Sequence, residues 1–215
     1  MAKQPAATPP LAGQLSLLES ELQLPLENPV DNVATISGPN TRVRAGNAME
    51  RARSAAIAGA LDVLAKRGAK ALTMAEVADA GGLARATLYN HVRDKQSLFH
   101  LVLGHEAREV ANLFTSESTL PKALTRASQF IAEHPALVGI RTHDPLSLAP
   151  LAVPTAGEGW NAIRELTRQA LVARGSKGTP AQVDVLLRWL TSFVVEPSDD
   201  ASRASQASAL AKSLH

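Results

Sequence analysis

The residues best suited to directional hydrogen bonding lie close together in the sequence, at Arg85, Thr87 and Asn90. An arginine guanidinium can bridge O6 and N7 of guanine, an asparagine amide can pair with adenine, and a threonine methyl can contact thymine. A threonine hydroxyl or an asparagine amide can equally bond to a backbone phosphate. With the small Ala86 between them, these residues suit a surface that must approach a nucleic acid closely.

The stretch 73–95 predicts how these side chains are held, as two short helices joined by a tight turn. Gly81 and Gly82 interrupt the helical pattern, because glycine reaches the left-handed conformation of a tight turn without a Cβ clash. Leu83 and Leu88 then pack the second helix onto the first. Periodicity alone indicates only two packed helices. The glycine turn and the polar outer face favour a DNA-binding helix-turn-helix, with an outer face made of Arg85, Ala86, Thr87, Tyr89 and Asn90.

Four segments of this region resemble the N-terminal DNA-binding domain of the TetR family of transcriptional regulators. The matching segments, in the family's order and spacing, are 60–68, 72–78, 81–91 and 94–98. The sequence departs from the family at Ala84, where a capping serine is usual, and at Val92, where phenylalanine is usual. The resemblance implies phosphate contacts from Thr73, Tyr89, His91 and Lys95.

Structural alternatives stay open for two of these residues. The ring of Tyr89 can pack inward and leave only its hydroxyl exposed, and His91 can bond to a carbonyl group at the end of a helix. Lys95 follows Asp94, a predicted helix N-cap, so its ammonium lies beside backbone N–H groups that attract anions.

Composition excludes several classes of protein. The 215 residues include no cysteine, which excludes disulfides, thiol redox chemistry and cysteine-based zinc sites. No apolar run approaches the ~20 residues of a membrane span, and the N-terminus lacks the pattern of a secretory signal. Alanine and leucine dominate and alternating patterns are nearly absent, so we expect an all-helical, cytoplasmic protein with no membrane association.

Positive charge is concentrated in one segment. The whole chain has a net charge of +2, but residues 41–95 carry ten Lys and Arg against five Asp and Glu. The excess coincides with the predicted DNA-binding segment, where phosphate neutralisation requires it.

The first 40 residues contain six prolines and predict a mostly irregular extension. Within it, Leu11, Leu15, Leu18 and Leu22 recur at helical spacing. Residues 11–26 therefore predict either a transient helix that folds back on its own body or a short amphipathic helix that docks into a protein partner.

Arg42 and Arg44 precede a helix predicted over about 46–66. One hypothesis is that they form an arm that reaches into the minor groove of DNA. The alternative is a solvated basic linker.

Residues 96–215 predict a helical body that begins with a long helix over about 95–115. A ligand is expected between the helices of residues 100–195, and a hydrophobic small molecule suits the apolar residues there. Residues 142–156 contain three prolines and predict a long loop. Candidate ligand contacts, of which Phe130 and Trp160 are equally consistent with plain core, are Phe130, Ile131, Leu137, His143 and Trp160.

The segment 179–195 predicts a helix that is apolar nearly all round, introduced by a capping box with proline at its first position. Such a helix is either internal or covered by a partner. A small helical body favours the second reading, and the resemblance implies dimers formed through the last helices. The predicted interface consists of Leu186, Leu187, Trp189, Leu190, Phe193 and Val194. The segment 198–214 predicts a marginal helix or a frayed tail.

Catalytic patterns are absent from the sequence. His134, His143, Asp144 and Glu158 match no zinc spacing, and we find no nucleophile elbow or phosphate-binding glycine loop. We therefore expect no enzyme, no cofactor and no metal.

The predicted architecture is all-α, with a flexible extension (1–40), a three-helix DNA-binding domain (41–95) and a helical regulatory and dimerisation domain (96–215). The expected function is that of a homodimeric regulator, in the family usually a repressor, that binds a palindrome in double-stranded DNA and is released by a small hydrophobic ligand. The alternative is an interaction protein that acts through residues 11–26, with DNA binding secondary.

Overall fold

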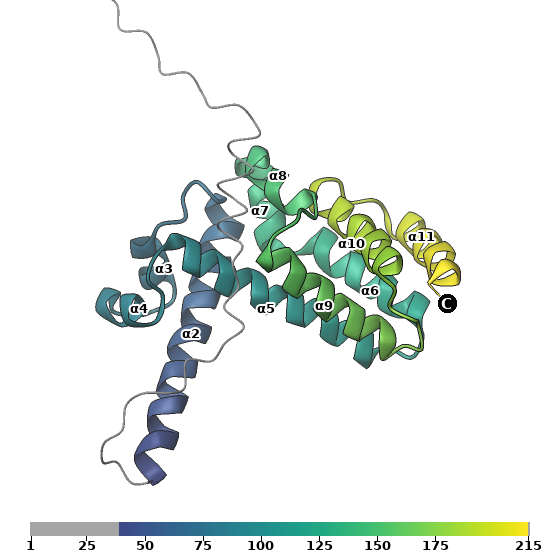
Figure 1. Ribbon diagram of the computed structural model, residues 1–215. Helices are drawn as coiled ribbons and strands as arrows, with labels where there is room; N and C mark the ends of the chain where they lie inside the picture. Colours follow the sequence, from purple (N-terminus) through teal and green to yellow (C-terminus); the bar gives the residue numbers. More distant parts are fainter. Residues whose placement is uncertain (1–38, 215) are drawn as a thin grey trace, which may run out of the picture.

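The computed structural model describes residues 39–214, and the side chains of residues 48–157 and 159–214. Every regular element in this part of the chain is a helix (Figure 1), so the predicted all-helical fold is confirmed. The predicted segment 11–26 lies outside the described residues. The elements are α2 (Pro39–Arg67), α3 (Met74–Ala80), α4 (Arg85–His91), α5 (Lys95–Ser116), α6 (Leu120–Glu133), α7 (Pro135–His143), η1 (Pro145–Leu148), α8 (Ala149–Ala152), α9 (Glu158–Val172), α10 (Pro180–Val195) and α11 (Asp200–Ser213).

Short polar side chains fix where several helices begin. The Thr73 hydroxyl accepts a hydrogen bond from the Glu76 amide at 3.2 Å and caps α3. The Asp94 carboxylate accepts one from the Ser97 amide at 2.7 Å, which caps α5 and lowers the pKa of Asp94. The predicted capping box at the start of α10 is present. The Thr179 side chain accepts from the Gln182 amide, and the Gln182 side chain accepts from the Thr179 amide.

Helix α2 is shared by the two parts of the molecule. Figure 1 shows α3 and α4 on one side of α2 and the larger helical bundle on the other, and α2 also packs against α7. The contact with α7 is close at Gly139, where an added Cβ would lie 2.3 Å from the carbonyl oxygens of Leu64 and Ala65. Only glycine allows the two helices to approach this closely.

The turn between α3 and α4 uses its two glycines for different reasons. Gly82 has a φ of +62°, which is the left-handed conformation predicted from the sequence. Gly81 has a φ of −83°, so the same prediction is wrong for Gly81. A Cβ on Gly81 would lie 2.5 Å from the carbonyl oxygen of Ala55, and glycine is needed there because α2 passes so close.

Two element boundaries differ from the sequence predictions. Helix α2 begins at Pro39 rather than near residue 46, so its regular hydrogen bonding includes the backbone of Arg42 and Arg44. The predicted loop over 142–156 contains η1 and α8. Pro145 and Pro150 stand in their first turns, where proline's missing N–H has no intrahelical partner to lose.

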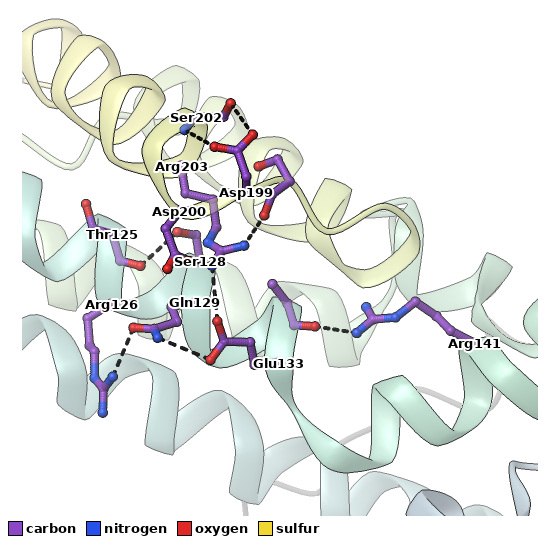
Figure 2. Close-up of polar contacts among 12 residues, drawn as sticks. Thr125, Arg126, Ser128, Gln129, Glu133, Arg141, Asp199, Asp200, Ser202 and Arg203 are labelled. Atoms are coloured by element: carbon purple, nitrogen blue, oxygen red, sulfur yellow. Dashed lines mark hydrogen bonds and ion pairs between the residues drawn. The ribbon is translucent and has the colours of Figure 1, made fainter.

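The C-terminal segment forms a regular helix, α11, because it has a cap at its start and a buried anchor. The Asp199 carboxylate accepts a hydrogen bond from the Ser202 amide at 2.9 Å. Arg203 is only 4% exposed and donates to Glu133 on α6 at 3.1 Å, as Figure 2 shows. Its guanidinium also donates to the Ser198 carbonyl and the Asp200 carboxylate. A buried charge paired on several sides holds α11 against α6.

Helix α10 buries its inner face within the single chain. Its apolar side chains pack within a core shared with α6, α9 and α11, and Arg141 caps its last turn by donating to the Phe193 and Val194 carbonyls at 3.0 and 3.1 Å. Burial lowers the pKa of Arg141. The predicted interface residues are therefore core residues, a correction to the sequence interpretation: Leu186, Leu187, Leu190, Phe193 and Val194 are buried and Trp189 is half-buried.

Candidate DNA-binding surface and internal cavity

The outer face of α4 carries the residues predicted to contact DNA bases. Leu88 is fully buried and anchors the helix, while Arg85, Ala86 and Asn90 are exposed and Thr87 is half-buried. Tyr89 is 54% exposed, so its ring does not pack inward as one interpretation of the sequence had it. The side chains lie on the face opposite the Leu88 anchor, and the helix is free to approach a groove with its small and polar residues first.

The predicted phosphate contacts are arranged around this helix. Thr73 is exposed at the start of α3, and His91 is half-buried in the last turn of α4. Lys95 is exposed at the start of α5, where its Nζ lies 3.3 Å from the Ala69 carbonyl oxygen and 5.7 Å from the centre of the Phe99 ring. The side chains of Arg42 and Arg44 lie outside the described part of the structure, so the minor-groove arm stays a prediction.

A carboxylate that the sequence interpretation considered only as a metal ligand joins the two parts of the molecule. Asp144 is 4% exposed, and it accepts hydrogen bonds from the Ala69 and Lys70 amides at 3.1 and 2.7 Å and from the Ser147 hydroxyl at 3.2 Å. The two amides belong to the turn after α2, which leads into the helix-turn-helix. Asp144 therefore clamps the DNA-binding part to the end of α7, a contact between residues 75 positions apart that no local pattern indicates.

A cavity of about 530 Å³ lies between α5 and the helices around it. This volume is within the range typical of small-molecule sites. Its lining includes four of the five predicted ligand residues, Phe130, Ile131, Leu137 and Trp160. The fifth, His143, is exposed and is not part of the lining.

Few polar groups reach this cavity. The Nε2 atom of His134 lies 3.1 Å from Oε2 of Glu106, which links the junction of α6 and α7 to α5 at the cavity wall. Burial lowers the pKa of His100, and the negative charge of Asp94 opposes this effect. The indole nitrogen of Trp160 is buried and has no hydrogen-bond partner among the described residues. The remaining lining is mostly aliphatic and aromatic, as a site for an apolar ligand requires.

The described part of the chain shows neither a metal site nor a membrane-spanning helix. Among the side chains of residues 48–157 and 159–214, no group of three or more histidine or acidic residues is arranged to hold a metal ion. No helix of this described region is both long enough and apolar enough to cross a membrane.

Comparison with known proteins gives one family match and several structural neighbours. Residues 56–102 match the model of the bacterial regulatory proteins of the tetR family. None of the curated proteins matches the sequence. One structural neighbour is the TetR-family repressor AlkX from Dietzia sp. strain DQ12-45-1b, which is implicated in biodegradation of n-alkanes. It is 20% identical to this chain with a TM-score of 0.56, and the alignment covers 75% of this chain and 94% of AlkX. A tetR-family regulator from Streptomyces coelicolor is 21% identical with a TM-score of 0.48, covering 77% and 79% of the two chains.

The family match falls on the helices that build the candidate DNA-binding surface. It begins in α2, includes α3 and α4, and ends in α5. The likeness to the AlkX structure extends the shared fold to the helical body. Residues 56–102 therefore carry a DNA-binding domain of the tetR-family type, made of the end of α2, α3, α4 and the start of α5, and the described chain shares the fold of the AlkX repressor.

Proposed function

We propose that this regulator is a cytoplasmic homodimeric repressor, that it binds a palindromic operator, and that it leaves the operator when a small apolar molecule fills the cavity. The observation that carries the proposal is the face of α4, where Arg85, Ala86 and Asn90 are exposed opposite the buried Leu88. A second support is the basic excess of residues 41–95. In a two-fold dimer, each α4 would read one half-site, with half-sites about 34–36 Å apart or somewhat more.

Dimerisation through α10 would use a surface other than the one first expected. The inner side chains of α10 are filled by contacts within the chain, so a second copy must meet the outward face. That face carries Val185, 48% exposed, together with the exposed Arg188 and Ser192. Val195, 52% exposed, lies near the end of the same helix.

Release by a ligand is supported by the position of the cavity. Its lining comes from α2 and from the turn after it, as well as from the body helices. A ligand that fits one arrangement of these elements better than another changes the population of dimers whose two DNA-binding parts are spaced for the operator. Asp144, which ties the same turn to α7, provides the rigid link that such a shift requires.

The test is selection of bound sequences from random duplex DNA, followed by fluorescence anisotropy with the selected operator. Arg85→Ala should weaken binding by about 1–3 kcal/mol and relax the preference at one position of each half-site. Arg126→Ala, which removes the same charge from an exposed position on α6, is the matched control and should leave the preference unchanged. An enriched motif without two-fold symmetry, or one indifferent to Arg85, would contradict the proposal.

A further inference from the structure

The exposed part of the cavity lining consists of two lysines. Among the described residues that line the cavity, only Lys70 and Lys95 are exposed, and all others are half-buried or buried. Lys70 lies in the turn after α2, and Lys95 begins α5. Both lie at the junction between the DNA-binding part and the body, and we take this exposed end of the lining as the opening of the cavity.

The ammonium groups of Lys70 and Lys95 have N–H donors that no acceptor in the described chain occupies. Within the described chain, the side chain of Lys70 has no hydrogen-bond or ion-pair partner, and Lys95 has one long hydrogen bond to the Ala69 carbonyl. Each ammonium can donate three hydrogen bonds. The single acidic residue in the described lining is Glu106, whose carboxylate is already paired with His134 at 3.1 Å. The nearby Asp144 has its oxygens occupied by two backbone amides and a hydroxyl.

The interior behind this opening is long and apolar. Its lining follows one face of α5 from Lys95 to Phe114, a length of about 28 Å at the rise of an α-helix. Most other side chains along this path are aliphatic or aromatic, and Phe114 lies farthest along α5. A mostly apolar lining that runs over this length of α5 suits one extended apolar chain.

We propose that the cavity binds an amphipathic anion, an unbranched apolar chain that ends in a carboxylate. The chain lies along α5, and the carboxylate pairs with Lys70 and Lys95 at the opening. The charge of the two lysines matches the headgroup, and the apolar interior matches the tail. Binding of the headgroup by the lysines and of the tail by the apolar interior does not require bound DNA.

A consequence for regulation rests on the proposed function. Lys95 is also one of the predicted phosphate contacts, so a carboxylate at the opening competes with DNA for the same ammonium. Binding of the anion then weakens the operator complex and removes one phosphate contact per protomer.

Direct binding is tested by isothermal titration calorimetry on the full chain without DNA, below the critical micelle concentration of each probe. The probes are dodecanoate, dodecanol and dodecyltrimethylammonium, which share a tail and differ in charge. Dodecanoate should bind about tenfold more tightly than dodecanol, because two partly exposed ion pairs are added, and the cation should bind most weakly. Shortening the carboxylate should weaken binding about fourfold per methylene group. Equal affinity for dodecanoate and dodecanol, or a preference for the cation, would overturn the proposal.

Variants locate the headgroup. Lys70→Gln and Lys95→Gln should each reduce the preference for dodecanoate over dodecanol by about threefold, while Lys122→Gln, an exposed lysine on α6 outside the lining, should not change it. Circular dichroism confirms that each variant is folded. A preference that survives the double variant Lys70→Gln/Lys95→Gln would show that the carboxylate lies elsewhere.

The regulatory consequence has a separate measurement. With saturating dodecanoate, the slope of the logarithm of operator affinity against the logarithm of salt concentration should fall in magnitude by about 0.9 per protomer. Calorimetric binding of dodecanoate without any effect on the operator complex would leave the ligand class standing and refute its role in release. Operator binding with no dodecanoate binding would overturn the ligand class and leave DNA recognition intact.

Discussion

Replacement of Asp144 tests whether the clamp between the two parts of the molecule stabilises the fold. The carboxylate accepts two backbone hydrogen bonds, at 3.1 and 2.7 Å, and one from Ser147. Hydrogen bonds to a charged partner are worth about 1.5–3 kcal/mol each. Asp144→Ala leaves both amides without their acceptor and should lower the free energy of unfolding by about 3–5 kcal/mol. Asp144→Asn keeps one acceptor but turns an amide donor toward an N–H group, and should cost about 2 kcal/mol.

Urea unfolding followed by circular dichroism measures these free energies, and hydrogen exchange reports on the two amides directly. The amides of Ala69 and Lys70 should exchange faster in Asp144→Asn than in the wild type. Ser147→Ala is the control, because it removes a partner of Asp144 and leaves both amide bonds in place; it should cost about 1 kcal/mol. If Asp144→Asn unfolds within about 0.5 kcal/mol of the wild type and both amides stay protected, the clamp does not stabilise the fold and the reasoning is wrong.

Two further predictions concern assembly and pH. Val185→Asp, on the half-exposed outer face of α10, should reduce the mass measured by light scattering from twice 22.6 kDa to that of one chain while the helical circular dichroism signal persists. The control Leu186→Asp, at a buried position, should unfold the chain. A dimer that survives Val185→Asp would exclude this face as the interface. Because burial lowers the pKa of His100 below its usual 6.5, the native state binds fewer protons than the unfolded state, so the free energy of unfolding should fall as the pH drops from 6.5 toward that lowered pKa. His100→Gln should flatten the dependence between pH 7.5 and 5 in urea titrations, and an unchanged profile would show that other groups cause it.

The DNA-binding part could be predicted from the sequence because its signals are local. Thr73 and Asp94 mark helix starts by the hydrogen bonds that their side chains make three residues away. Leu88, buried on the inner face, follows from helical spacing alone. Gly81 shows where local signals end: its need for glycine comes from the Ala55 carbonyl on another helix, and the sequence does not reveal that neighbour.

The body was harder to predict because its organisation depends on which helices cover one another. An apolar pattern on α10 fits an internal helix and an interface helix equally well. In the structure α10 is covered by α6, α8 and α9, which no pattern within α10 indicates. The alanine- and serine-rich sequence of α11 likewise gave little sign of a stable helix. Arg203 explains the difference, since a basic residue expected on the surface is buried against Glu133 instead.

The residues of α2 that face α7 set a limit on how this regulator can be divided. One continuous core contains Val77 and Leu88 of the DNA-binding helices together with Ala136 and Ile140 of α7. A cut at the predicted boundary after residue 95 would pass through this core and expose its apolar side chains to water. A DNA-binding module taken from this chain for use in a hybrid regulator must therefore carry α7 with it. Recombination between related regulators is expected to preserve the pairing of α2 with α7 for the same reason, so the specificity of one parent for DNA would be inherited together with part of its ligand-responsive body.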